Sequence, residues 1–175
     1  MTESPPPGLT VAIDLVNELV IEPAPDARAA LEALFAFDPA SVADRPGELV
    51  PEFAALAERL HAVVVAAAEA RVDDAARRIN ELLTDSPAVP HLELTEGRWT
   101  LHHHAQHAGV VAAWTAICAE ALARLVDEGR AERVHLCESP SCGRAFIDTT
   151  KSGTRRFCSE RCQNREKAAA RRSRG

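Results

Sequence analysis

The sequence has no tyrosine, and only 4% of its 175 residues are aromatic. Its hydrophobic content is nevertheless 46%, so the apolar residues are chiefly Ala, Leu and Val. Sheet sandwiches favour aromatic and β-branched residues in alternation, whereas alanine and leucine favour helices. The composition therefore disfavours a mostly-β protein and predicts a mainly α fold of ordinary single-domain size with a small appendage.

Long apolar runs are also missing. No stretch reaches the ~18 uninterrupted apolar residues of a membrane span. The start, Met1 to Pro7, lacks the basic-then-apolar order of a signal peptide. We therefore expect a cytoplasmic protein without a membrane partner.

Signatures of catalysis are missing as well. The sequence has no phosphate-cradling glycine loop, no Ser-His-Asp order and no evident pair of catalytic carboxylates. We therefore do not expect an enzyme, and we name no catalytic residue.

Charge is divided unevenly along the chain. Residues 1–129 carry 8 Arg and 21 acidic residues, a net charge of −13, whereas residues 130–175 carry 12 Lys or Arg and 5 acidic residues, a net charge of +7. A local excess of positive charge attracts polyanions. In the free protein the basic segment can also lie against the acidic body.

Apolar periodicity predicts an amino-terminal helical body with one β-hairpin. The second helix has Asp26 as its N-cap and ends at Asp38-Pro39, the third has Pro51 as its first residue, and the last ends at Gly129. The expected helices cover residues 9–21, 26–38, 51–71, 73–83 and 105–128, and the hairpin covers 92–101.

Four of the five cysteines lie near the carboxyl end, in the order C-x4-C-x15-C-x3-C. They are Cys137, Cys142, Cys158 and Cys162. Two pairs of thiolates suit a tetrahedral Zn(II) ion, and four of them leave no position for a water molecule. We therefore predict one structural zinc ion per chain; free or oxidisable thiols are the alternative.

The residues around the cysteines predict a small treble-clef-like zinc-binding module. A turn at the first pair would precede two short strands at 145–148 and 155–157, and a helix would carry the second pair. Phe146 and Phe157 are the expected core of this module. It has so little other apolar material that metal binding must supply much of its folding free energy.

This segment resembles the CGNR zinc-finger family. The similar features are Cys142-Gly143, Phe146-Ile147-Asp148, Arg155-Arg156-Phe157-Cys158 and Cys162-Gln163-Asn164-Arg165, with Gln163 where the family has glycine. The helical body resembles the family's ABATE domain less specifically, at Ala12 to Asn17 and at Ile79 to Leu82. The resemblance implies a bacterial, stress-induced transcription regulator, with an ABATE-like sensor domain at 1–130 and a zinc finger at 131–175.

The basic helix after the last cysteine is the candidate DNA-binding element. Guanidinium and amide groups contact phosphates and can read base edges. The candidate nucleic-acid contacts are Arg155, Arg156, Arg161, Asn164, Arg165, Lys167, Arg171 and Arg172. Docking on an acidic protein partner, or redox sensing through the zinc thiolates, are the alternative functions.

Three further features are candidates for other roles. Asp14 and Asn17 lie one helical turn apart and either brace a loop or line a ligand pocket for a small-molecule effector; the body is also a candidate for homodimer contacts. The cluster from His102 to His107 is attributed to packing or capping, with a second metal site as the less favoured alternative. Cys118 is expected to be a buried apolar residue.

Overall fold

The computed structural model describes residues 5–37, 46–86, 88–95, 97–105 and 108–172, and it has the mainly α architecture that the composition predicts. Within these residues, no helix combines the length and the apolar character needed to span a bilayer. The elements in chain order are α1 (Pro7–Val16), the π-helical turn η1 (Asn17–Ile21), α2 (Ala27–Leu34), α3 (Pro46–Ala68), α4 (Val72–Asp85), β1 (His91–Thr95), β2 (Arg98–His102), α5 (Val110–Asp127), the 3-10 turn η3 (Ala131–Arg133), β3 (Val134–Leu136), β4 (Ala145–Ile147) and α6 (Glu160–Arg172).

Helix ends follow two of the predicted capping residues. The Asp26 carboxylate accepts a hydrogen bond from the Ala29 amide at 3.0 Å and caps α2, and α5 ends just before Gly129. The prediction that Pro51 begins the third helix is wrong, because Pro46 takes the first position and Pro51 lies inside α3. The second helix ends at Leu34, earlier than the predicted end at Asp38-Pro39, and these two residues lie outside the described ones.

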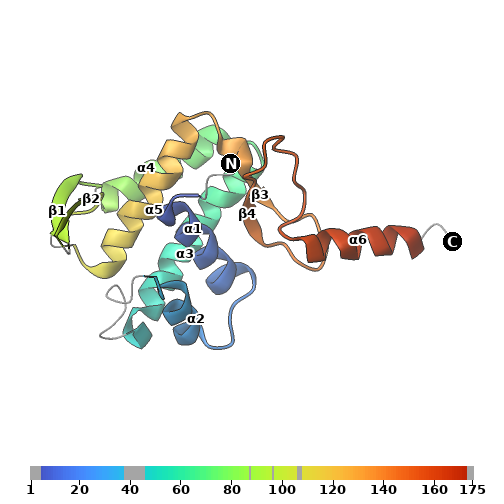
Figure 1. Cartoon of the computed structure of the whole chain (residues 1–175), viewed down its shortest axis with the longest axis horizontal. Helices are drawn as coiled ribbons and strands as arrows, with labels where there is room; N and C mark the ends of the chain where they lie inside the picture. The colour runs from blue at the N-terminus through green and yellow to red at the C-terminus, as the bar shows by residue number, and fades with distance from the viewer. Residues whose placement is uncertain (1–4, 38–45, 87, 96, 106–107, 173–175) are drawn as a thin grey trace.

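The core of the body forms where α1, α3 and α5 meet (Figure 1). The aromatic rings of Phe35, Phe53 and Trp114 pack together there. The centroid of the Phe35 ring lies 5.2 Å from that of Phe53 and 5.0 Å from that of Trp114. A Cβ atom at Gly8 would lie 2.7 Å from the Ile117 carbonyl oxygen. Only glycine therefore allows α1 to approach α5 this closely.

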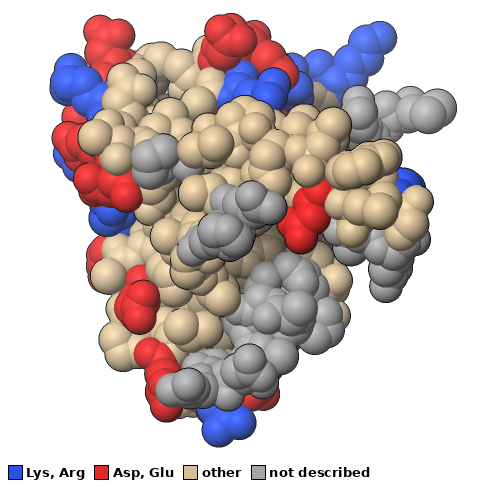
Figure 2. Space-filling view, turned by 90° about the vertical axis from the view of Figure 1, so that its left-hand side faces the viewer, with Lys and Arg blue, Asp and Glu red and all other residues tan. Residues whose placement is uncertain are grey.

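The predicted hairpin is present as β1 and β2, at the opposite end of the molecule from α6 (Figure 1). Leu92 pairs with Leu101, and Leu94 pairs with Trp99. All four of these side chains are exposed, between 53% and 65%. Seen from the hairpin side, uncharged side chains fill most of the centre of the surface (Figure 2).

The strands of the carboxyl-terminal module differ from the prediction. β4 pairs with β3, which precedes Cys137, and residues 155–157 form no strand. The buried Asp148 carboxylate provides the reason, because it accepts hydrogen bonds from the Thr150 and Arg155 amides at 2.8 Å each. These amides are satisfied by a side chain, so the loop closes without a second ladder.

The module is joined to the body through a shared core. Val134 of β3 and Ala145 of β4 belong to the same buried cluster as the helices of the body. Asn17 reinforces the joint: its Nδ2 donates to the Ala145 carbonyl at 3.0 Å and its Oδ1 accepts from the Ala145 amide at 2.8 Å. Arg144 adds ion pairs with Glu18 at 2.7 Å and Glu22 at 3.0 Å.

The basic helix does not lie against the acidic body, so among the described residues α6 does not form the contact that the net charges would allow. α6 projects away from the helices, and its end is the far tip of the described chain (Figure 1). The tie between module and body instead forms at β4, through Arg144 and Asn17.

We predict that Asn17→Ala lowers the free energy of unfolding by about 2–3 kcal/mol, because it removes both hydrogen bonds and leaves the buried Ala145 amide and carbonyl without partners. Urea denaturation followed by circular dichroism measures the loss. Asn80→Ala on the exposed face of α4 is the matched control and should change the stability by less than about 0.5 kcal/mol. Equal stabilities of the two variants would contradict the role of Asn17.

Candidate metal centre

The four predicted cysteines converge on one point. Their sulfur atoms all lie within 4.8 Å of one another, with the Cys158 Sγ 3.6 Å from that of Cys142 and 3.7 Å from that of Cys162. They come from two different parts of the module, the turn between β3 and β4 and the start of α6. In the part of the chain that the structure describes, no other group of ligand atoms is gathered as closely.

The first pair is set by a tight turn. The Cys137 amide donates to the Arg144 carbonyl at 2.8 Å, and the Cys142 amide donates to the Ser139 carbonyl at 2.9 Å. Gly143 has a φ of +71°, a conformation that side chains with a Cβ rarely adopt. This turn points both thiols away from the strands and toward the second pair.

The second pair is placed differently from the prediction that one helix carries both thiols. α6 begins at Glu160, so Cys158 precedes it and only Cys162 lies within it. The Ser159 hydroxyl accepts a hydrogen bond from the Cys162 amide at 3.3 Å, as an N-capping serine does. A helical cap therefore replaces the expected extra turn and brings the two sulfur atoms together.

Hydrogen-bond donors are directed at the sulfur atoms, as a cluster of thiolates requires. The Cys158 amide donates to the Cys137 Sγ at 3.4 Å, and the Arg165 guanidinium donates to the Cys162 Sγ at 3.2 Å. The pKa of Cys162 is lowered to about 7, with the hydrogen bond from Ser159 as the largest cause. Burial raises the pKa of Cys158 to about 12, so a cation is needed to deprotonate this thiol at neutral pH.

The sulfur positions fit a zinc ion. Four sulfur atoms at 2.3 Å from a tetrahedral centre lie about 3.8 Å from each other, close to the 3.6 and 3.7 Å observed here. Four thiolates close the coordination shell, so the site stabilises structure and has no position for a reacting water. Phe146 and Phe157 pack around the cysteines, which confirms the predicted core of the module.

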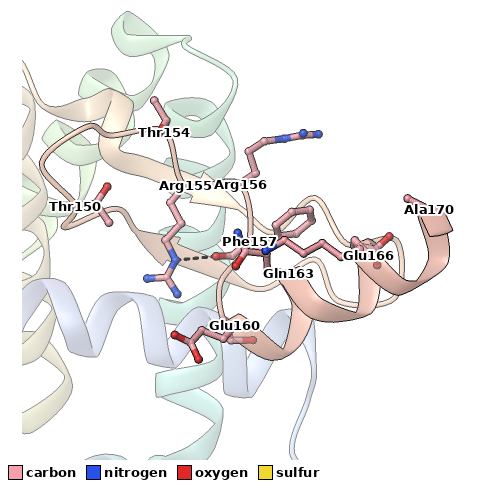
Figure 3. Close-up of a pocket in the computed structure, with 11 residues that line it drawn as sticks. Thr150, Thr154, Arg155, Arg156, Phe157, Glu160, Gln163, Glu166 and Ala170 are labelled. Carbon is pink, nitrogen blue, oxygen red and sulfur yellow. Dashed lines mark hydrogen bonds between the residues drawn. The ribbon is translucent and has the colours of Figure 1, made fainter.

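Three of the predicted nucleic-acid contacts are engaged in building the module. The Arg155 guanidinium donates to the Phe157 carbonyl at 2.8 Å (Figure 3). The same guanidinium lies over the Phe146 ring. Arg156 pairs with Glu138, and Arg165 donates to Ser139 at 3.0 Å as well as to the zinc ligand Cys162. These three arginines hold the loops around the metal.

The other five predicted contacts are exposed along α6. They are Arg161, Asn164, Lys167, Arg171 and Arg172. Within the described residues, these five side chains form no ion pair and no side-chain hydrogen bond. Gln163 lines an open hollow of about 660 Å³ between α6 and residues 154–157 (Figure 3). The Gln163 side chain, at the position where the similar family has glycine, is exposed.

Asp14 and Asn17, the candidate ligand-pocket residues, both line a cavity of about 370 Å³ between α1 and the module. Arg144 and Cys158 line the same cavity from the other side. Both polar atoms of the Asn17 side-chain amide form hydrogen bonds with Ala145, so Asn17 braces a loop, as one of the two sequence-based expectations stated. Burial raises the pKa of Asp14, against the lowering effect of Arg144.

The histidines of the predicted cluster from His102 to His107 lie in two different surroundings. His103 lies 3.7 Å from Glu120 of α5, whereas His102 and His104 gather with His91 of β1, which the sequence analysis did not single out. Only the strand register, which sets His91 opposite His102, could have revealed the third ring. His107 lies outside the described residues. Cys118 is fully buried, as expected, and burial raises the pKa of its thiol.

We predict that the purified protein contains one equivalent of zinc, and that Cys142→Ser lowers this content to well below one. The variant or a strong chelator should unfold residues 137–172, because zinc binding contributes about 10 kcal/mol or more to the folding of such modules. Elemental analysis and amide hydrogen exchange measure the two effects. Cys118→Ala, which removes the one cysteine outside the cluster, should keep a full equivalent; a folded segment without metal would contradict the prediction.

We also predict that Asp14→Asn stabilises the protein at neutral pH. A carboxyl group with a raised pKa favours the folded state when protonated, so its contribution is present below pH 3.8 and is lost as the pH rises through the folded-state value. The advantage of the variant should therefore grow from pH 4 to pH 7 in urea denaturation. An advantage that is independent of pH would show that Asp14 is not desolvated.

The geometry agrees with a comparison to known families. The family model described as the CGNR zinc finger matches residues 133–175, a range that includes all four cysteines and the whole of α6. No curated protein matches the chain. Four gathered thiols, their two turns and the family match together identify residues 133–175 of this chain as a CGNR zinc finger.

Proposed function

We propose that the protein is a DNA-binding transcription regulator in which α6 contacts the nucleic acid. The observation that carries the proposal is the exposed row of Arg161, Asn164, Lys167, Arg171 and Arg172 on a helix that projects from the body (Figure 1). Cationic side chains without acidic partners are available for phosphates, and release of counterions then drives binding. We further propose a role without catalysis.

The zinc centre gives α6 a fixed starting direction. Cys162 attaches the first turn to the cluster, and Ser139 donates to Glu166 at 2.7 Å one turn later. A helix held in this way can enter a major groove without first paying the full entropy of ordering. Asn164 is the residue on this exposed row whose amide is suited to adenine.

We propose that the body senses a small molecule or mediates dimerisation. The cavity beside Asp14 supports the first role, because a ligand there would touch α1 and the zinc ligand Cys158 together. A positively charged or hydrogen-bond-donating group suits the carboxylate of Asp14. Native mass spectrometry of freshly purified protein tests this role: a bound small molecule that Asp14→Leu loses would support it, and its absence from both proteins would favour dimerisation.

We predict that Lys167→Gln and Arg171→Gln each weaken binding to all DNA sequences and lower the slope of log affinity against log salt by about one. Fluorescence anisotropy with a set of duplexes at several salt concentrations measures both quantities. Arg28→Gln on α2, an exposed arginine of the body, is the matched control and should leave the slope unchanged. Asn164→Ala should alter sequence preference more than the salt slope.

An affinity that does not depend on salt would exclude this mechanism. If the zinc-loaded chain binds no duplex but binds acidic peptides through the same row, the alternative of an acidic protein partner applies. Arg165→Gln should lower zinc retention as well as DNA affinity, because Arg165 donates to the Cys162 sulfur, whereas Lys167→Gln should lower DNA affinity alone. The contrast between the two variants separates DNA contact from module stability.

A further inference from the structure

Three imidazole rings meet on one face of the hairpin, at the end of the molecule farthest from the zinc finger (Figure 1). His91 and His102 are directly opposite each other in the strand register and stack with centroids 5.4 Å apart. His104 approaches both edge-on, at 5.4 Å from His91 and 5.2 Å from His102. The rings come from two strands and the segment that follows, so the fold gathers them.

Two of these rings hold a buried nitrogen without a hydrogen-bond partner among the described residues. The atoms are the Nε2 of His91 and the Nε2 of His102. Buried polar atoms are rarely left without partners, and each exception needs a physical reason. A third such nitrogen is the Nε2 of His135 in β3. The His135 ring packs on the Phe146 ring, and among the described residues no other histidine ring packs against it.

Backbone carbonyls fix the tautomers of two of the three rings, His91 and His104. The Nδ1 of His91 lies 3.2 Å from the Val89 carbonyl oxygen, and the Nδ1 of His104 lies 2.9 Å from the Ala105 carbonyl oxygen. A carbonyl oxygen only accepts, so each Nδ1 carries the hydrogen and each neutral ring presents the Nε2 lone pair. A histidine held through one nitrogen by a carbonyl, with the other nitrogen free, is the arrangement of a metal ligand.

A carboxylate completes the group. The Oε2 of Glu93 lies 4.0 Å from the Nε2 of His91 and 3.8 Å from the Nε2 of His102. Two ligands at about 2.0–2.1 Å from a tetrahedral ion are about 3.3–3.5 Å apart, so the two distances from Glu93 exceed bonding separations by roughly half an ångström. Glu93 is 53% exposed and can rotate to make this closure.

We propose that His91, His102, His104 and Glu93 form a second metal site, which takes a divalent transition cation such as Zn²⁺, Co²⁺ or Ni²⁺. Imidazole and carboxylate are suitable ligands for these ions, whereas Ca²⁺ and Mg²⁺ prefer oxygen ligands alone. The site is distinct from the finger in ligand chemistry and in position, and it does not depend on the proposed DNA binding. His103 is not part of the proposed site, since its Nδ1 lies 3.7 Å from the Oε1 of Glu120.

The site would stabilise an element that has little other support. A two-stranded hairpin is marginal alone, and the apolar face of this one, with Leu92, Leu94, Trp99 and Leu101, is exposed. A metal ion would join β1 to β2 and to the segment leading into α5. Binding should therefore slow amide hydrogen exchange in the hairpin, which a chance surface contact with the ion would not do.

The test uses the full chain with its finger already loaded with one equivalent of zinc. Isothermal titration with Zn²⁺ alone should reveal a second equivalent, and His91→Gln or His102→Gln should weaken it at least tenfold while the finger keeps its zinc. His103→Gln is the matched control and should bind as the unchanged protein does. Co²⁺ in this site should give visible bands without the sulfur charge transfer of the cysteine site.

The outcomes separate clearly. A single equivalent of zinc, or a second one that survives in the His91→Gln/His102→Gln double variant, would overturn the proposal. A second equivalent that His103→Gln weakens equally would also overturn it. The retained zinc of the finger shows that the finger of the variants is intact, and circular dichroism checks that the helical body is unchanged. A second equivalent lost in the site variants alone then supports the assignment.

Discussion

The structure of residues 137–172 depends on the convergence of four sulfur atoms within 4.8 Å of one another. The turn from Cys137 to Cys142 is what returns the chain as β4 beside β3, and the placement of Cys158 and Cys162 determines where α6 begins. The loop between the two pairs has no ladder of its own and is closed by the Asp148 carboxylate. Without deprotonated thiols held together, the few apolar residues around Phe146 could not order this segment.

The same β4 strand connects the finger to the helical body. Two adjacent residues at the start of this strand make the contacts. Ala145, the first residue of β4, exchanges hydrogen bonds with Asn17, and Arg144, just before it, pairs with Glu18 and Glu22. The acidic residues that face the finger thus attract one arginine at its base and leave α6 free. The net charges of the two segments therefore do not describe how they interact. The attraction is limited to Arg144 and its two acidic partners, and the basic helix α6 projects outward (Figure 1).

The sequence predicts the features that depend on local chemistry. Helical periodicity, the Asp26 cap, the hairpin around Gly97 and the four cysteine ligands all follow from neighbouring residues. It does not predict features that depend on tertiary pairing. The partner of β4 and the stacking of His91 on His102 are examples, because register is not visible in one strand. Arg155 and Arg165 look like nucleic-acid contacts in the sequence, since a cation that supports a thiolate cluster has the same side chain as one that binds phosphate.

The joint between body and finger is also where sensing and DNA binding would be coupled in the proposed regulator. α1 and η1 supply Asp14 to the cavity, Asn17 to the brace and Glu18 to the ion pair, all within two helical turns. A ligand that contacts Asp14 would therefore compete for, or reinforce, the contacts that hold Arg144 and Ala145. Because the zinc centre makes the finger rigid, a small shift at β4 would turn α6 as a whole. In the proposed regulator, a stiff module on a polar joint would meet the mechanical requirement for such coupling.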